Sequence, residues 1–178
     1  GHMGRNLLAD VSITNQDRNV VRFLWRVLKD TIKDETKFKE ILCEKDKIGD
    51  FLLHIVVWQG SLWALKFTWD EIEKIIKEEE ARRDYFLLKG QLDRIALTVS
   101  VLNNNELVFA WMMQKFLNFF EINEKVPSEG PREKINFPEI LTTVDGMKTT
   151  LISVIFTLGT VNKISLILKT ISKFDFRS

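Results

Sequence analysis

Residues 46–69, DKIGDFLLHIVVWQGSLWALKFTW, contain a short apolar segment, a glycine and a second segment that begins directly after it. Six of the seven residues from Phe51 to Val57 are apolar, and they concentrate this bulk within about two helical turns. Gly60 readily adopts the left-handed conformation with which many helices end. The stretch therefore predicts a short helix, a tight turn and a second helix antiparallel to the first.

The same pattern occurs two more times along the chain, and no gap is needed inside any unit. Leu53 aligns with Leu97 and Ile152, which gives spacings of 44 and 55 residues between the units. The remaining columns join Val56, Ser100 and Ile155; Gly60, Asn104 and Gly159; Leu65, Phe109 and Ile164; and Trp69, Met113 and Leu168. Asp46 and Asp145 also align, and a weaker copy at the start of the chain carries Leu8, Val11, Asn15, Val20 and Leu24. The recurrence predicts four helix pairs, each of which buries its apolar side against the next pair.

Three of these units resemble the T-P-L-H-x-A-A-x-x-G motif of the ankyrin-repeat family. The motif columns read FLLHIVVWQG at residues 51–60, IALTVSVLNN at residues 95–104 and TLISVIFTLG at residues 150–159. The histidine is present only in the first of them, and the spacing exceeds the usual period of about 33 residues. The resemblance implies an all-α solenoid of about four helix pairs with elongated second helices. It also implies that His54 is a structural residue whose ring bonds to neighbouring backbone.

The chain is expected to form one domain, residues 4–178, after a Gly1-His2-Met3 segment that resembles a cloning remnant. The approximate units are residues 4–45, 46–89, 90–136 and 145–178, with a long loop at 121–144. Within them we predict helices at residues 5–14, 19–32, 61–80 and 161–173, the second of which has Asp17 as its N-cap. Residues 33–45 are expected to form a short helix, residues 77–84 a solvated helix end or loop, and residues 85–88 a small additional turn. In the third unit, Asn103, Asn104 and Asn105 replace the glycine turn, and Asn105 is able to cap the helix that follows.

Composition excludes several classes of protein. Hydrophobic residues make up 45% of the 178 residues and charged residues 29%, so the chain can bury a core and is not disordered by composition. The net charge of +1 gives no field that favours nucleic acid or an anionic membrane. The 14 uncharged residues at 149–162 are too few for an integral membrane span, which needs about 20. Cys43 is the only cysteine, which excludes an internal disulfide and predicts an intracellular location, cytoplasmic or nuclear.

No set of residues predicts catalysis, a cofactor or a metal. His54 is the only histidine outside the remnant, and with Cys43 it supplies two zinc ligands where about four are needed. No motif around these two residues would orient a nucleophile and its base. The glycines are scattered rather than clustered in a phosphate-binding loop, and the five tryptophans are not interleaved with basic residues along the sequence. We therefore expect a protein that is not an enzyme and that binds neither a cofactor nor nucleic acid.

The resemblance to ankyrin repeats implies a partner protein that binds along the concave side. Carried over column by column, it assigns partner binding to Asp50, Trp58, Gln59, Arg94, Leu102, Asn103, Thr149, Thr157 and Leu158. Trp58 is the strongest candidate, because Val56 and Val57 fill packed columns and large aromatic side chains dominate binding hot spots. The predicted structural residues are Leu53, His54, Gly60, Leu65, Trp69, Leu97, Asn104, Phe109, Met113, Ile152, Gly159, Ile164 and Leu168.

Other interpretations stay open. One is an inhibitory or regulatory ankyrin fragment that blocks its partner, and the chain is also compatible with part of a longer repeat array. Another is a helical ligand-binding or enzymatic domain with a pocket near residues 85–88 and 127–138. A third is a closing amphipathic helix that lies on a membrane surface.

Overall fold

The computed structural model describes residues 17–103, 105–125 and 137–171. In these ranges the chain is all-helical, as predicted, and no β-strand is present. The helices are α2 (Arg18–Thr31), α3 (Glu35–Leu42), α4 (Leu52–Gln59), α5 (Leu62–Ile75), α6 (Glu79–Phe86), α7 (Ala96–Leu102), α8 (Glu106–Lys125), α9 (Phe137–Thr142), α10 (Leu151–Leu158) and α11 (Val161–Ile171), with a 3-10 helix at Gln91–Asp93. The predicted first helix at residues 5–14 lies outside the described residues.

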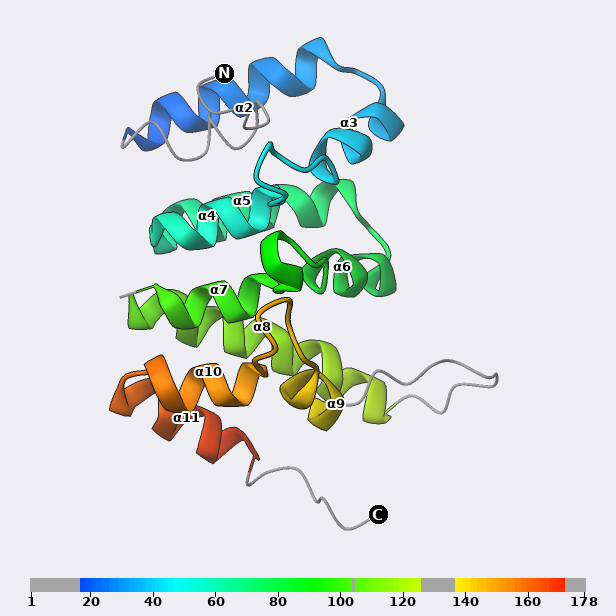
Figure 1. The fold of residues 1–178 in the computed structure, drawn as a ribbon. Coiled ribbons are helices and arrows are strands. Elements are labelled where there is room, and N and C mark those ends of the chain that lie inside the picture. Colours follow the sequence, from blue (N-terminus) through cyan, green and yellow to red (C-terminus); the bar gives the residue numbers. More distant parts are fainter. Residues whose placement is uncertain (1–16, 104, 126–136, 172–178) are drawn as a thin grey trace.

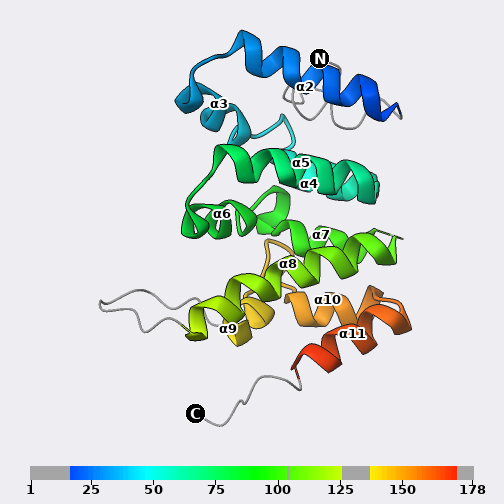
Figure 2. The same ribbon diagram turned by 180° about the vertical axis from the view of Figure 1, so that it is seen from behind.

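The short helices and the longer ones form two adjoining rows. In the first row α4 packs on α7 and α7 packs on α10, while in the second row α5 packs on α8 and α8 packs on α11. Each short helix also contacts the longer helix that follows it in the chain. Figures 1 and 2 show the resulting order, in which the pairs follow one another from α2 at one end to α11 at the other.

The spacing of 44 residues has a structural origin in a third helix between successive pairs. Helix α6 begins and ends 44 residues after α3, and α9 occupies the same side of the molecule in Figure 1. Leu42, Phe86 and Leu141 lie 44 and 55 residues apart in these helices, and all three are buried. The third helix therefore accounts for the length of the 44-residue spacing.

Helix α5 ends at Ile75 rather than near residue 80, and the segment predicted to be a helix end or loop is α6. The side chain of Arg82 explains the break, because its Nη1 donates to the carbonyl oxygens of Ile76 and Lys77, at 3.2 and 2.9 Å. These two carbonyls follow the last residue of α5, where backbone acceptors need a partner. The reversal also brings Phe86 onto the ring of Trp69, with 5.6 Å between ring centroids.

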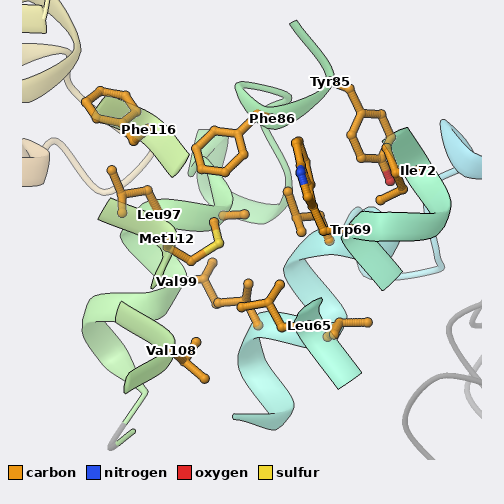
Figure 3. Close-up of a cluster of buried hydrophobic side chains, with 14 of the residues drawn as sticks. Leu65, Trp69, Ile72, Tyr85, Phe86, Leu97, Val99, Val108, Met112 and Phe116 are labelled. Carbon is orange, nitrogen blue, oxygen red and sulfur yellow. The ribbon is translucent and has the colours of Figure 1, made fainter. Parts of the chain in front are cut away.

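The buried columns of the second and third units meet in one hydrophobic core. Figure 3 shows Leu65 and Trp69 of α5 facing Val108, Met112 and Phe116 of α8. Leu53, Leu97, Phe109 and Met113, which belong to the predicted columns, are buried as well. Val56, Ser100 and Ile155, which share a single column, are all fully buried.

The last unit departs from the predicted columns. Ile152 and Ile164 are only half-buried, and Leu168 is 49% exposed, so Leu168 is not a core residue. The buried residues of α11 are Lys163 and Ile167, one position earlier along the helix. The reason is that α11 packs against α8 and α10, and among the described residues no further pair covers its other side, where Leu168 lies.

The turns between paired helices are less uniform than the sequence predicted. Gly60 adopts the left-handed conformation, with φ of 72°, whereas Gly159, in the same column, has φ of −74°. Glycine is still required at position 159, because a Cβ there would lie 2.2 Å from the carbonyl oxygen of Ile155. Asn105 caps α8 as predicted, since its Oδ1 accepts from the backbone N–H groups of residues 107 and 108 at 3.0 and 3.3 Å. Asn104 lies outside the described residues.

Two further boundaries differ from the prediction. The long loop predicted at residues 121–144 is interrupted, because α8 continues to Lys125 and α9 lies within its second half.

Asp17 caps α2 as predicted, with its carboxylate accepting from the backbone N–H of Asn19 at 2.8 Å. Across the described ranges, no helix combines the length and the apolarity that a membrane crossing requires.

Candidate binding surface

Two loops that precede short helices, residues 46–50 and 145–149, fold in the same way. In each loop the backbone N–H of the first residue donates to the carbonyl oxygen of the fifth at 2.8 Å. The carboxylate of Asp46 accepts from the N–H groups of Ile48 and Asp50 at 3.0 and 2.9 Å. The carboxylate of Asp145 accepts from those of Met147 and Thr149, both at 2.9 Å. Asp46 and Asp145, aligned by sequence alone, thus perform the same local task.

The loop between them, residues 90–94, closes with the same backbone hydrogen bond, from Gly90 N–H to the carbonyl oxygen of Arg94 at 2.8 Å. Gly90 stands where the other loops have aspartate, and the carboxylate of Asp50 instead accepts from the N–H of Gln91 at 2.8 Å. The fourth residue of every loop has a positive φ: 95° at Gly49, 54° at Asp93 and 60° at Lys148. The closing hydrogen bond and the positive φ at the fourth residue thus recur at three places, while the middle loop also has a positive φ of 58° at its third residue, Leu92.

Neighbouring loops are bonded to one another. Gly146 N–H donates to the carbonyl oxygen of Leu92 at 2.7 Å, and Arg94 Nε donates to Asp145 Oδ2 at 2.8 Å. Burial raises the pKa of Asp145, but hydrogen bonds from Arg94 and Thr149 outweigh it and lower this pKa to about 2. The loops are therefore held in fixed relative positions by hydrogen bonds and an ion pair.

His54 joins the second unit to the third. It is 2% exposed, and its Nε2 donates to the carbonyl oxygen of Arg94 at 2.8 Å, while Nδ1 is buried without a hydrogen-bond partner. Gly90 allows the ring to approach, because a Cβ at residue 90 would lie 2.8 Å from His54 Cδ2. His54 thus makes the kind of contact to neighbouring backbone that the ankyrin resemblance implies.

Acid is expected to weaken the fold through His54. Burial lowers its pKa, more than the Arg94 carbonyl and the nearby Asp50 raise it, so the folded chain resists protonation below the ordinary value of about 6.5 while the unfolded chain does not. The contribution of neutral His54 is fully present above this value and is lost as the pH falls. Urea unfolding between about pH 7.5 and pH 5 should therefore show a steeper loss of stability for wild type than for His54→Gln. Equal slopes would assign the acid sensitivity to other groups.

The tips of the three loops expose large apolar side chains at one equivalent position. Ile48 is 58% exposed, Leu92 is 43% exposed and Met147 is 57% exposed. They are 44 and 55 residues apart, which is the spacing of the core columns. We call these three residues the tip row. The sequence analysis did not predict the tip row, because it considered only the columns expected to be buried. The same alignment, with spacings of 44 and 55 residues, places these three residues in one column.

The predicted partner-binding residues divide into two groups. Trp58 and Leu158, at the ends of α4 and α10, are 59% and 60% exposed, and Gln59 and Thr157 beside them are exposed too. The other side chains make contacts within the chain. Asp50, Arg94 and Thr149 join the loop bonds described above, Leu102 packs against the core, and the Asn103 side chain donates to the carbonyl oxygens of residues 57 and 58 at 3.1 and 2.7 Å.

The described ranges contain no group of three or more histidine, cysteine, aspartate and glutamate side chains that could hold a metal ion. Cys43 is exposed at the end of α3, and partial burial raises the pKa of its thiol, which disfavours the reactive thiolate. This surface thus consists of exposed apolar side chains on loops that are hydrogen-bonded to one another.

The chain was compared with protein-family models, with curated proteins and with solved structures, and none of the three comparisons found a match.

Proposed function

We propose that this chain is an ankyrin-like array of helical units that binds a partner protein through the tip row and the exposed ends of the short helices. The proposal contains two claims, one about architecture and one about function. Each has its own support in the described residues.

The repetition of local geometry supports the architecture. Equivalent loops share a backbone hydrogen bond and a residue with positive φ. Successive short helices pack on one another, and successive loops are hydrogen-bonded to one another. A stack in which each unit contacts mainly its neighbours is the defining property of repeat arrays. The third helix of each unit distinguishes this array from the usual ankyrin pattern.

The observation that carries the functional claim is the tip row. Three large apolar side chains are exposed at equivalent positions, on loops that are hydrogen-bonded to one another. Exposed apolar groups in such an arrangement favour a protein partner that covers them, and loops held in place before binding lose little conformational entropy on association. The aligned side chains are uncharged, so the expected partner presents a partly apolar surface.

Removing the apolar tips should abolish partner capture without unfolding the chain. The variant Ile48→Ser/Leu92→Asn/Met147→Gln replaces each tip by a polar residue, and asparagine suits Leu92 because it tolerates the positive φ found there. We expect wild type to retain one or more proteins from a cell extract and the triple variant to lose them. With a purified captured protein, calorimetry should show at least about a tenfold loss of affinity, equivalent to about 1.4 kcal/mol.

The matched control is Leu107→Ser, which removes an apolar side chain that is 65% exposed at the start of α8, away from the loops. It should bind as wild type does, whereas Trp58→Ala tests the contribution of the short-helix ends. Equal binding by wild type and the triple variant would contradict the proposed surface. An activity assay on the captured partner then separates a scaffold from the alternative, an inhibitory domain that blocks its partner.

A further inference from the structure

A cavity of about 250 Å³ lies between the third and fourth units, beside the loop that follows α6. Its walls come from the segment 87–98 on one side and from the segment 139–151 on the other. The lining residues are Leu87, Lys89, Asp93, Arg94, Ile95, Thr98, Glu139, Ile140, Thr143, Val144, Asp145 and Leu151. Several of them are exposed, so the cavity opens to solvent.

A change of residue in one column explains why the cavity is here. Thr98 lies 44 residues after His54, at the equivalent place on α7. Between the second and third units, the ring of His54 reaches across to the carbonyl oxygen of Arg94. Between the third and fourth units, the much smaller threonine leaves the corresponding space unfilled, and Thr98 lines the cavity instead. The cavity thus results from the threonine that stands in the column of His54 at the contact between the third and fourth units.

The cavity combines apolar walls with one mostly buried polar side chain that belongs to no ion pair. Its apolar lining consists of Leu87, Ile95, Ile140, Val144 and Leu151. Thr98 lines the cavity and is 5% exposed. Its hydroxyl oxygen is not one of the fully buried unpaired atoms of the described residues, so it is open to the cavity. Arg94 and Asp145, the other well-buried polar residues, are bonded to each other at 2.8 Å. A hydroxyl group at the wall of an apolar cavity gains a hydrogen bond when a ligand supplies the partner, which favours such a ligand there.

The charged residues around the cavity argue against an anionic ligand. Lys89 and Arg94 are basic, whereas Asp93, Glu139 and Asp145 are acidic, and Arg94 is already neutralised by Asp145. An anion would therefore enter a region with a small excess of negative charge. A neutral group avoids this repulsion and also the desolvation of its own charge against apolar walls.

We propose that this cavity binds a small neutral ligand, about one aromatic ring in size, that carries one hydrogen-bonding group directed at the Thr98 hydroxyl. The volume fits this size, since cavities of about 150 Å³ hold a benzene ring. The bound ring lies against Ile95, Ile140 and Leu151, and it bridges α7 to α9 and α10. Because the ligand contacts two units at once, it stabilises the packing of the third unit against the fourth. This site is independent of the tip row and of the proposed partner protein.

The test uses p-cresol as the probe and toluene as the probe that lacks the hydroxyl group. Methyl resonances of Thr98, Ile95, Ile140 and Leu151 in the ¹³C-labelled full chain should shift in a saturable manner with p-cresol, with a Kd of about 0.1–1 mM. The same titration should raise Tm, because the ligand binds only the folded state. Shifts that are confined to other parts of the chain, or that do not saturate, would overturn the proposal.

Thr98→Val separates the hydroxyl group from the shape of the cavity, since it replaces that group by a methyl of similar size. It should weaken p-cresol binding roughly three- to tenfold and leave toluene binding within about twofold. Ile140→Trp should fill the cavity and remove both. If Ile140→Trp does not fold, the affinities of Thr98→Val for p-cresol and toluene still test the proposed site. An unchanged affinity for p-cresol would contradict the role of Thr98.

Discussion

Replacing Trp69 with alanine is expected to lower the free energy of unfolding by about 3–5 kcal/mol, the usual range for a large buried aromatic residue. Trp69 is fully buried, and its ring contacts those of Phe86, Trp111 and Phe119 at centroid distances of 5.6, 6.2 and 6.1 Å. These partners come from α6 and α8, so the resulting void lies where the second and third units meet (Figure 3). Urea unfolding followed by circular dichroism measures the loss.

Trp58→Ala is the matched control for this substitution. The Trp58 side chain is 59% exposed, and surface substitutions usually change stability by less than about 0.5 kcal/mol. Trp69→Phe should fall between the two, because it keeps an aromatic ring but loses the hydrogen bond from the indole Nε1 to Glu73 at 2.5 Å. If Trp69→Ala and Trp58→Ala destabilise the chain equally, Trp69 does not hold the two units together.

The helices and inner columns could be predicted because they depend on local periodicity. Leu53 and Leu97, or Leu65 and Phe109, are separated by a constant 44 residues, and each pair is buried because the same helix meets the same neighbours in each unit. The expectation that every residue of a column is buried fails at Leu168. A column residue is buried only when another unit covers it, whatever the position of the residue on its own helix. Periodicity cannot report whether such a neighbour is present.

The break at Ile76 has no local signal in the sequence, because neither glycine nor proline marks it. Residues 61–80 read as one continuous helix, and the chain turns only because Arg82 takes up carbonyl groups at the end of α5 and Phe86 packs on Trp69. These contacts join residues on the two sides of the break, so they leave no local signal. The alignment of α6 with α3 contained the information, since residues 35–42 were already expected to be helical.

In the candidate surface, exposure that depends on neighbours in the same helix could be predicted, whereas contacts between residues far apart in the sequence could not. Trp58 could be predicted to lie at the surface because its neighbours in α4 occupy packed columns. Arg94 was assigned to partner binding, yet its guanidinium pairs with Asp145, which is 51 residues away. A long-range ion pair of this kind cannot be inferred from the spacing within one unit. The tip row, by contrast, was accessible to sequence reasoning, because its three members share the spacing of the core columns.

Lys163→Met is expected to lower the free energy of unfolding by about 2–3 kcal/mol, because hydrogen bonds from a charged donor contribute about 1.5–3 kcal/mol. Lys163 is 2% exposed, and it occupies the column of Ala64 and Val108. Its Nζ donates to the carbonyl oxygens of Ser100, Val101 and Asn103, at the C-terminal end of α7. A cation at this end of a helix also interacts favourably with the helix dipole. Methionine keeps the apolar stem but removes the donor.

The control is Lys66→Met on the exposed side of α5, which should change stability by less than about 0.5 kcal/mol. The comparison matters because a buried ammonium group loses hydration, and a well-packed apolar residue can be equally stable in its place. Unfolding in urea at neutral pH distinguishes the two cases. If Lys163→Met is as stable as wild type, the hydrogen bonds of Lys163 only offset its desolvation. If it is less stable by the expected amount, Lys163 joins the last unit to the C-terminal end of α7, as Asn103 joins the third unit to the C-terminal end of α4.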